Sequence, residues 1–452
     1  MVAENAGVPT VTVHTTGFET SARSTGEGSG LPNLPTAEYP GAIDTHSPDA
    51  IKKNVEEVLL DRVVKALIKS TEKAGTTSGI REPGPRDIVF KGSFEEVNDY
   101  YYKNLWSDGL PIVPPTLKKV EEFLKFTDRS PNEVIGLLPP ARREATVWNI
   151  AVNGVMAGCR PEYMPILIAV VEAIGDPHFG LQHAGSTAGW TPLIILNGPI
   201  NRQLDFNDKV GVLRPGNQAN TSVGRFLRLF MRNVPRFLPG SSDMGTFGGN
   251  FFLVLAENEV DSPWHPLSVD LGFKAEANLV TVNSILSMSI PNPTQGAKAK
   301  DHLDMLAGLL QKQFRGNVMT FGPEMHPMIV MTPVIANLLA KEGVSKKDVR
   351  QYIFEKARVT AREFDADGAG LVDSVCNLVK AKKLPPLFCE SEDPNRMLPV
   401  FHSPDELFVI VSGDPTRNRV FAANQLGYQG CATTREIRLP KNWGQLMAEL
   451  SR

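Results

Sequence analysis

Hydrophobic positions recur along the chain with two spacings, which predict alternating strands and helices. Short apolar runs that each end in a turn signal predict buried strands: Leu193–Leu196, Phe251–Leu255, Met328–Met331 and Leu407–Val411. Apolar residues at helical spacing lie between them, in the segments Pro161–Ile174, Val223–Val234, His302–Phe314, Pro333–Lys341 and Ser345–Ala357. This alternation predicts an α/β fold with a mixed or mostly parallel sheet and flanking helices.

The N-terminal part of the chain has a different organisation. Val8–Val13 alternates β-branched residues and predicts a buried strand, whereas Ser21–Ala42 is rich in Gly, Ser, Thr and Pro and predicts a loop. Ser47 and Pro48 then predict the N-cap and first turn of an amphipathic helix that continues to Leu67. These elements form an incomplete Rossmann- or flavodoxin-like segment. They cannot enclose a core, so we expect the rest of the chain or another subunit to cover them.

The polar, Gly- and Pro-containing segment that follows predicts a linker. We therefore divide the chain into an incomplete α/β segment at residues 1–71, a linker at residues 72–92 and a large α/β domain at residues 93–452. The last of these is long enough for two subdomains. Several strands are followed by Gly-Pro or Gly-Asp-Pro, but this recurrence is not a convincing internal repeat.

Composition and charge narrow the classes of function. With 42% hydrophobic and 21% charged residues the chain has the composition of a globular protein. Its net charge of −3 supplies no positive field for nucleic acid. Since no apolar run approaches the roughly 20 residues that cross a bilayer, we expect a cytoplasmic protein with no membrane or nucleic-acid partner.

Cysteines and histidines point to neither a disulfide framework nor a metal site. The four cysteines are widely spaced with no C-x-x-C pair, and the eight histidines contain no H-x-x-x-H. The chain also lacks a Walker motif and a G-x-G-x-x-G that follows a strand. The sequence therefore predicts no metal and names no cofactor.

The strongest candidate for chemistry is the segment from Gly158 to Tyr163. Cys159 lies just before the helix that begins at Pro161, where the helix dipole and Arg160 would favour the reactive thiolate. Glu162 in the first turn would either oppose that effect or act as an acid or base. The alternative is a small buried cysteine beside a capping glutamate.

A second candidate follows a predicted strand. Glu257 and Asn258 should lie beyond the carboxyl end of that strand, where ligands collect in open α/β sheets. Glu257 could act as a general base with His265 as its partner and Trp264 as a wall of the site. The alternative is a surface loop with solvated carboxylates. Asn197 also ends a strand and could line the same crevice, although an ordinary turn explains it equally well.

A third candidate is a polar entry to a helix at Gly216–Asn220, where backbone amides could hold a carboxylate or phosphate. Four arginines follow at helical spacing and should share one face that binds an anionic substrate or an acidic partner: Arg225, Arg228, Arg232 and Arg236. A solvated or salt-bridged surface is the alternative. The predicted catalytic residues are Cys159, Glu162, Glu257 and His265, and the predicted substrate-binding residues are Asp108, Asn153, Asn197, Asn220, Arg225, Asn258 and Trp264.

Two stretches resemble parts of the UGSC family, which is named for a Gly-Ser-Cys motif with a preceding cysteine or selenocysteine. Residues 6–13, Phe18, Ala22-Arg23, Gly30–Pro35 and the helix after Ser47-Pro48 resemble the C-terminal half of the UGSC domain. The signature motif should lie upstream of this stretch and is absent from the chain. A separate subunit that carries the motif could supply the other half.

The region from about Trp106 to Pro440 resembles uncharacterised domains that accompany UGSC domains. The matching pieces are Asp108–Thr116, Ala151–Tyr163 and Ala256–Glu259 followed by Ser262-Pro263-Trp264. The resemblance implies no established reaction for this region, but the redox motif of the family favours an oxidoreductase.

Three hypotheses for function follow. The first is a thiol-dependent oxidoreductase that acts on a small polar or anionic substrate. The second is a lyase or hydrolase that uses Glu and His for acid–base chemistry, with a structural Cys159. The third is a non-catalytic subunit that completes a partner chain carrying the Gly-Ser-Cys motif. In each case the uncovered N-terminal segment predicts a homo-oligomer or hetero-oligomer.

Overall fold

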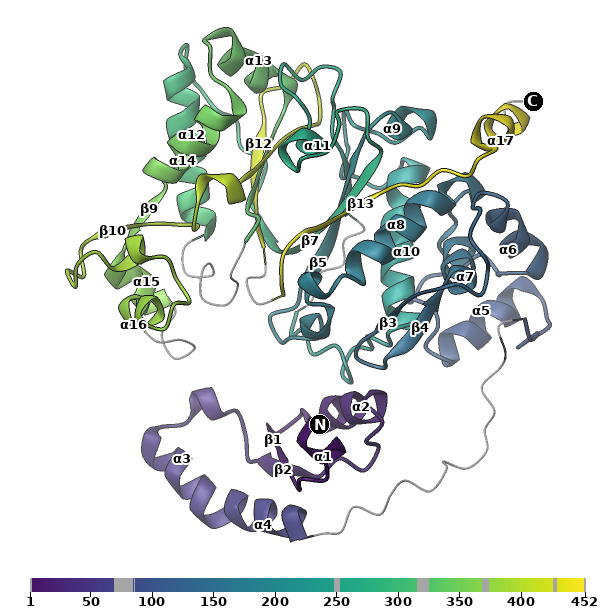
Figure 1. Ribbon diagram of the computed structural model, residues 1–452, viewed down its shortest axis with the longest axis vertical. Coiled ribbons are helices and arrows are strands. Elements are labelled where there is room, and N and C mark those ends of the chain that lie inside the picture. The colour runs from purple at the N-terminus through teal and green to yellow at the C-terminus, as the bar shows by residue number, and fades with distance from the viewer. Residues whose placement is uncertain are drawn as a thin grey trace.

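The computed structural model describes residues 2–68, 84, 86–247, 253–314, 325–367, 374–425 and 429–450. Figure 1 shows a small N-terminal unit and a larger one in which helices flank a twisted sheet. The predicted mixed α/β fold is confirmed. Most of the predicted linker, residues 72–83 and 85, lies outside the described residues, as do the first two residues of the predicted strand Phe251–Leu255.

In the N-terminal unit two short strands run parallel. They are β1 (Thr12–Thr15) and β2 (Thr36–Tyr39), connected through α2 (Glu19–Gly28) and preceded by α1 (Val2–Asn5). One continuous helical segment follows, made of α3 (Pro48–Asn54), a π-helical turn (Val55–Leu59) and α4 (Leu60–Ile68). Ser47 caps this segment as predicted, because its hydroxyl accepts a hydrogen bond from Ala50 N at 3.3 Å.

Two predictions for this unit are wrong. The predicted loop Ser21–Ala42 contains most of α2 and all of β2. Two parallel strands need a crossover connection, and an ion pair of 2.6 Å between Arg23 and Glu19 supports the helix that provides it. The predicted buried strand at Val8–Val13 begins only at Thr12, and the Val13 side chain is 50% exposed.

The large unit is built on a mixed seven-stranded sheet. Its strands are β5 (Thr191–Asn197), β6 (Leu253–Ala256), β7 (Leu279–Met288), β8 (Met328–Met331), β11 (Phe408–Val411), β12 (Val420–Gln425) and β13 (Thr433–Glu436). The order is β11-β8-β12-β7-β5-β6, and β13 pairs with β7. The four strands predicted from apolar runs correspond to β5, β6, β8 and β11, and are confirmed.

The sheet contains a repeated arrangement of strands. In the first half the parallel pair β5 and β6 is followed by β7, which runs antiparallel to β5. In the second half the parallel pair β8 and β11 is followed by β12, which runs antiparallel to β8. Strands β7 and β12 then pair antiparallel at the centre. The sequence analysis finds no convincing repeat, because the halves share strand order and direction rather than a residue pattern.

Alternate strand residues point to opposite faces of this sheet. Leu193 and Ile195 of β5 pack on the inner face, where side chains from all six strands of the path form one apolar cluster. Ile194 and Leu196 pack on the outer face against helices. The two edge strands, β6 and β11, approach each other at their carboxyl ends. There Asn258 N, just after β6, donates to the carbonyl of Val411 in β11 at 2.8 Å. The sheet is therefore strongly curved around its own inner face.

Two groups of helices cover the outer face, one for each half of the sheet (Figure 1). The first comprises α7 (Val147–Ala157), α8 (Met164–Ile174) and α10 (Gln218–Asn233). The second comprises α12 (Ala299–Phe314), α13 (Pro333–Lys341) and α14 (Lys346–Lys356). All of these helices except α7 correspond to the five predicted segments, which are confirmed with ends shifted by up to five residues.

Shorter elements surround this core. They are α5 (Phe94–Lys103), α6 (Leu117–Leu124), the hairpin of β3 (Val134–Leu138) and β4 (Arg143–Thr146), α9 (Ile200–Gln203), α11 (Leu267–Asp270), α17 (Trp443–Leu450), and the 3-10 turns Pro161–Tyr163, Pro177–Phe179, Leu181–His183, Pro386–Cys389 and Pro404–Glu406. One more 3-10 turn, Ile43–Thr45, belongs to the N-terminal unit.

A small insertion lies between α14 and β11. It contains β9 (Arg358–Thr360), α15 (Ala361–Asp367), α16 (Val375–Lys380) and β10 (Met397–Pro399), and β10 pairs antiparallel with β9. A disulfide joins Cys376 to Cys389 in this insertion. The cysteine spacing predicts no disulfide framework, and this single bond is a correction, since its partners lie 13 positions apart in no recognised motif.

Candidate functional site

Cys159 lies where the sequence places it, just before the helical segment that begins at Pro161, but its side chain is buried. Burial raises the pKa of the Cys159 thiol to about 12, an effect that a hydrogen bond with Ser222 and the charge of Arg225 only partly offset. The thiolate would not be populated near neutral pH. The structure therefore fits the buried alternative better than the activated cysteine, which stays a prediction.

The charged residues near Cys159 pair with one another. Arg160 Nε lies 2.6 Å from Glu162 Oε1. Arg225 donates two hydrogen bonds to Asp108, from Nε to Oδ2 at 2.9 Å and from Nη2 to Oδ1 at 2.8 Å. Nη2 of Arg225 also donates to the Pro111 carbonyl at 2.9 Å. Arg225 and Asp108 thereby hold the extended segment after Trp106 against α10, and this accounts for both residues structurally.

Three of the predicted substrate-binding asparagines form hydrogen bonds with other residues of the chain. Asn153 accepts a hydrogen bond from Asn233 Nδ2 at 2.8 Å. Asn220 donates to the Asn207 carbonyl at 3.0 Å and accepts from Asn207 N at 2.9 Å. The side chain of Asn258 closes a turn with Asp261, donating to its Oδ2 at 2.9 Å. Their contacts are those of buried polar groups that need partners.

Carboxylates gather at the carboxyl ends of β5 and β6, where the sequence places Asn197 and Glu257. Asn197 Nδ2 donates to Glu257 Oε2 at 2.7 Å and to Glu259 Oε1 at 3.0 Å. Gly198 N also donates to Glu259 Oε1, at 2.8 Å. Burial raises the pKa of Glu259, and the charge of Glu257 adds to this effect while the two hydrogen bonds oppose it. The structure thus joins two predicted residues, and Glu259 becomes a third member.

Buried cations balance these carboxylates. Lys346 Nζ lies 3.7 Å from Glu257 Oε1 and 3.1 Å from Asp270 Oδ2, and Arg350 Nη2 lies 2.6 Å from the same Asp270 oxygen. We call Glu257, Lys346, Asp270 and Arg350 the buried ion network. His265 Nε2 contacts Asp270 Oδ1 at 2.8 Å, so His265 is paired with Asp270, whereas the sequence predicted Glu257 as its partner.

Sequence reasoning missed most of this network. Trp264 was predicted to be a wall of the site, and its Nε1 donates to the Val344 carbonyl at 3.1 Å, near the start of α14. Lys346 and Arg350 follow on that helix four residues apart, so they face the same way. That spacing was a usable signal, but nothing in it names Asp270 as the partner.

A cavity of about 470 Å³ lies beside α10. We call it the arginine pocket, and it is lined by Asp108, Ala184, Gly189, Trp190, Arg228, Met231, Arg232, Phe237, Pro239, Gly240, Asp243, Met244, Gly245 and Phe247. Two loops that hydrogen-bond to each other form part of its wall, through Met244 N to the Gly185 carbonyl and Thr246 N to the Thr187 carbonyl, each at 2.9 Å.

Two guanidinium groups line the arginine pocket. Arg228 donates to the Trp190 carbonyl at 3.2 Å and to Thr191 Oγ1 at 3.3 Å. Arg232 donates through Nε to the Leu105 carbonyl at 2.7 Å and has no ion pair among the described residues. Burial lowers the pKa of both arginines. Because an arginine ordinarily titrates above pH 12, both stay charged at neutral pH.

The four arginines predicted to share one face divide into three environments. Arg225 is paired with Asp108, whereas Arg228 and Arg232 line the pocket. Arg236 lies beyond the end of α10 with φ 68°, so its predicted place on the helical face is wrong. The predicted anion-binding entry at Gly216–Asn220 is capped by Asn217, whose side chain accepts from Asn220 N at 3.0 Å.

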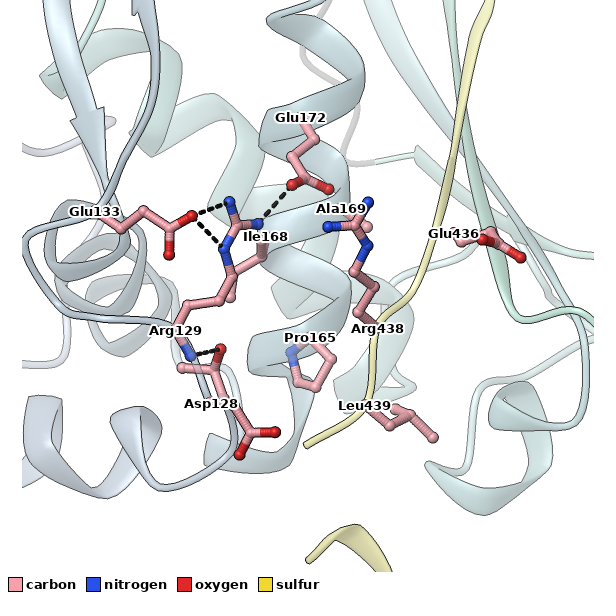
Figure 2. A pocket seen from close by; sticks show the side chains of 11 residues that line it. Asp128, Arg129, Glu133, Pro165, Ile168, Ala169, Glu172, Glu436, Arg438 and Leu439 are labelled. Atoms are coloured by element: carbon pink, nitrogen blue, oxygen red, sulfur yellow. Dashed lines mark hydrogen bonds and ion pairs between the residues drawn. The ribbon is translucent and has the colours of Figure 1, made fainter. Parts of the chain in front are cut away.

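A second cavity, of about 290 Å³, lies between α8 and the segment after β13 (Figure 2). Arg129 is held on two sides, by Glu133 at 2.7 Å and by Glu172 at 2.5 Å. Arg438 and Glu436 also line this cavity. Its most buried cation, Arg129, is already paired with two carboxylates. This cavity is therefore a weaker candidate for an anion-binding site than the arginine pocket.

The described residues contain no group of three or more His, Cys, Asp or Glu side chains that could hold a metal ion. No single helix in the described part of the chain is long and apolar enough to cross a membrane. One bent pair, Pro161–Ile174 with Pro177–His183, meets the length and composition of a broken span.

The fold and its cavities define a mixed α/β protein with a buried ion network at one end of the sheet and an arginine-lined pocket beside α10. The N-terminal unit is similar to a known family, since residues 1–69 match the model of the UGSC family. This agrees with the resemblance identified from the sequence. No curated protein and no solved structure matches the chain.

Proposed function

We propose that the protein is an enzyme that acts on a small anionic molecule held in the arginine pocket. The observation that carries this proposal is the position of Arg228 and Arg232, which lie four residues apart on α10 and line one cavity. Guanidinium groups bind carboxylates and phosphates through paired N–H donors. Since Arg232 has no ion-pair partner among the described residues, an anionic ligand would supply one.

The other lining residues limit the kind of ligand. A volume of about 470 Å³ suits a small metabolite rather than a polymer. Trp190, Met231 and Phe237 add apolar surface to the wall. We therefore expect a substrate that combines an acidic group with an apolar portion.

Asp243 is the candidate general base of this pocket. Its Oδ1 accepts a hydrogen bond from Gly245 N at 3.1 Å, which orients the carboxylate. A carboxylate that removes a proton beside guanidinium groups that stabilise the resulting anion is an arrangement suited to a lyase or hydrolase. We favour this acid–base chemistry over the thiol-dependent oxidoreductase hypothesis, because the Cys159 thiol is buried and its pKa is raised.

Calorimetric titration with a panel of small carboxylates and phosphate esters tests the binding step. For any ligand that binds, Arg232→Met should weaken affinity by about tenfold or more, since it removes a charge-assisted hydrogen bond. The exposed Arg214 lies outside the pocket, so Arg214→Met is the matched control and should bind normally. Equal affinity of the Arg232 variant and the unaltered protein would contradict the proposal.

Turnover of such a ligand separates the two chemistries. Asp243→Asn should retain binding and lose turnover, which means a fall in kcat with little change in KM. Cys159→Ala should retain turnover if the cysteine is structural. The opposite pattern, in which Cys159→Ala abolishes turnover and Asp243→Asn does not, would restore the thiol hypothesis.

A second proposal concerns the N-terminal unit, which we infer completes a partner chain. Strands β1 and β2 pair only with each other among the described residues, although two-stranded parallel sheets rarely stand alone. The helix that follows exposes a row of apolar side chains: Val55, Leu60, Val64, Leu67 and Ile68. A homo-oligomer, or a hetero-oligomer with a chain that carries the Gly-Ser-Cys motif, would cover this surface.

A further inference from the structure

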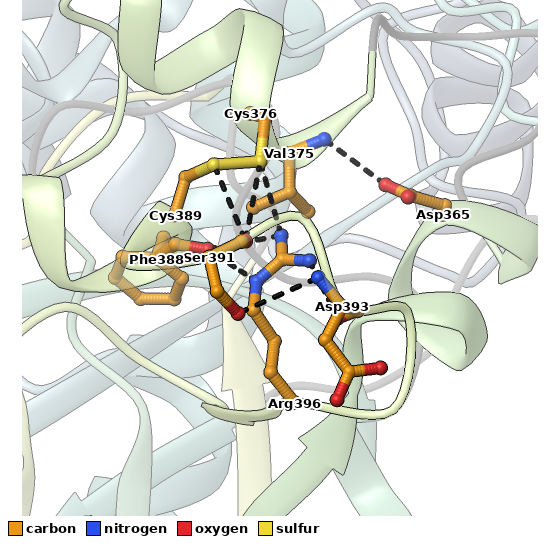
Figure 3. Close-up of a disulfide and its surroundings, with 8 residues drawn as sticks. All are labelled: Asp365, Val375, Cys376, Phe388, Cys389, Ser391, Asp393 and Arg396. Atoms are coloured by element: carbon orange, nitrogen blue, oxygen red, sulfur yellow. Dashed lines mark hydrogen bonds between the residues drawn. A yellow bond between two sulfur atoms is a disulfide. The ribbon is translucent and has the colours of Figure 1, made fainter.

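The disulfide of the insertion has an environment that favours chemical exchange. Cys376 lies in the first turn of α16 and Cys389 ends the 3-10 turn Pro386–Cys389. Their Cα atoms are 5.1 Å apart, and both residues are only partly buried, so a small thiol in solution can approach the bond. Figure 3 shows the two sulfur atoms beside the side chain of Arg396.

Arg396 places a positive charge on one of the two sulfurs. Its Nη2 donates to Cys376 Sγ at 3.3 Å. The guanidinium is fixed there by the carbonyl of Phe388, which it contacts at 3.2 Å, and by the carbonyl of Asp393, at 2.9 Å. Arg396 forms no ion pair among the described residues. Its charge is therefore available to stabilise a Cys376 thiolate, whereas within the described parts of the chain no cation contacts Cys389 Sγ.

The two cysteines are anchored independently of the disulfide. Val375 beside Cys376 is buried, and its N–H donates to Asp365 Oδ1 at 3.0 Å (Figure 3). Phe388 beside Cys389 is also fully buried. Since both neighbours belong to the same apolar core, the sulfurs should stay close after the bond opens.

We propose that Cys376 and Cys389 form a reversible thiol–disulfide exchange site for small thiols such as glutathione. The thiolate of the incoming molecule attacks Cys389 Sγ, the bond between the two protein sulfurs breaks, and Cys376 leaves as a thiolate beside Arg396. A second small thiol then attacks the mixed disulfide and releases Cys389. The protein gains two electrons and two protons, and two small thiols become one small disulfide, so the exchange balances.

The direction of attack follows from the contact with Arg396. A thiol of lower pKa is the better leaving group, so attack at Cys389 is the faster route. The same contact favours the return reaction, in which Cys389 attacks the small disulfide and the Cys376 thiolate then attacks Cys389 Sγ of the mixed disulfide and expels the small thiol. This site is distinct from the arginine pocket and from Cys159, and does not depend on the proposed function of either.

The test follows the redox state of the full-length protein in glutathione buffers. Thiols are trapped with iodoacetamide at timed intervals and counted by peptide mass spectrometry. We expect the pair to open in reduced glutathione without denaturant and to close again in oxidised glutathione. Arg396→Gln should slow opening by roughly threefold to tenfold, as a shift of about one unit in the pKa of the leaving thiol implies.

Two further variants keep the result interpretable. Arg362→Gln removes an exposed arginine of the same insertion that forms no hydrogen bond with either sulfur, and in this variant the disulfide should open at the unaltered rate. Arg396→Lys keeps the charge and should open faster than Arg396→Gln, while circular dichroism checks that each variant is folded. A pair that opens only in denaturant, never closes, or opens equally fast in Arg396→Gln overturns the proposal.

Discussion

At the scale of single residues, Lys346 has the environment that most constrains the molecule. Its side chain is 1% exposed, and its charge lies between the carboxylates of Glu257 and Asp270. Asp270 has a second cation in Arg350, whereas Lys346 is the cation that the described residues bring to Glu257. Removing it would leave Glu257 as a buried charge without a counterion.

We therefore expect Lys346→Met to lower the free energy of unfolding by about 3–5 kcal/mol, the usual cost of removing one partner of a buried ion pair. Chemical denaturation monitored by circular dichroism measures this change. Lys347→Met alters the exposed neighbour and should change stability by less than about 0.5 kcal/mol. Glu257→Gln combined with Lys346→Met should recover part of the loss. If Lys346→Met is as stable as its control, Glu257 is not held as a buried charge.

Residue environments could be predicted only where the signal was local. Asn197 and Glu257 could be placed at the end of a sheet because each follows an apolar strand. Lys346 could not be connected with them, because the contact joins segments 89 positions apart, which no local pattern encodes. The burial of Cys159 could not be decided from its neighbours in the sequence, because the residues that surround it include Ser222 and Arg225 of α10.

At the scale of elements, the turn at Gly180 joins the end of the α8 region to the approach of β13. Gly180 has φ 70°, and a Cβ at this position would overlap the backbone oxygen of Gln429. Gln429 Nε2 in turn donates to the Gly180 carbonyl at 2.9 Å. The backbones can approach this closely only without a side chain at position 180.

Gly180→Ala should therefore cost about 3 kcal/mol or more, from the left-handed backbone and from the steric overlap together. Gly272 is the matched control, since it also has positive φ, of 84°, but a Cβ there would meet no heavy atom within 4 Å. Gly272→Ala should cost only about 1 kcal/mol, the backbone part alone. Thermal unfolding of the two variants measures the difference, and similar losses would show that the overlap is relieved at little cost.

Helices and strands could be predicted where the spacing of hydrophobic residues distinguished one from the other. The strands of the central sheet and the helices that cover it followed from apolar runs and helical spacing, because their burial imposes those patterns. Helix α2 did not follow, since Glu19–Gly28 is rich in Gly, Ser and Thr, residues that ordinarily disfavour a helix. Its formation is favoured by the crossover that two parallel strands require.

At the scale of the whole molecule, the central sheet is complete and the N-terminal unit is not. The sheet buries both faces, one under two groups of helices and the other against itself. By contrast, Leu60 and Ile68 of α4 are 57% and 76% exposed. Composition could not reveal this curved sheet, because it arises from pairing between the two halves rather than from any one segment.

This difference predicts the behaviour of a chain that starts at residue 84. Its unfolding should remain cooperative with a Tm within about 3 °C of the full-length value, since the core clusters begin at Ile112. Light scattering at micromolar concentration should show an oligomer for the full-length protein and a smaller assembly for the truncated one. Leu60→Lys should disrupt the same association without truncation, whereas Glu57→Lys, an exposed charged site on the same helical segment, should not. A strictly monomeric full-length protein would mean that the apolar face of α4 remains in water, and the N-terminal unit would then have to be stable as an isolated two-stranded unit, contrary to the energetics of such sheets.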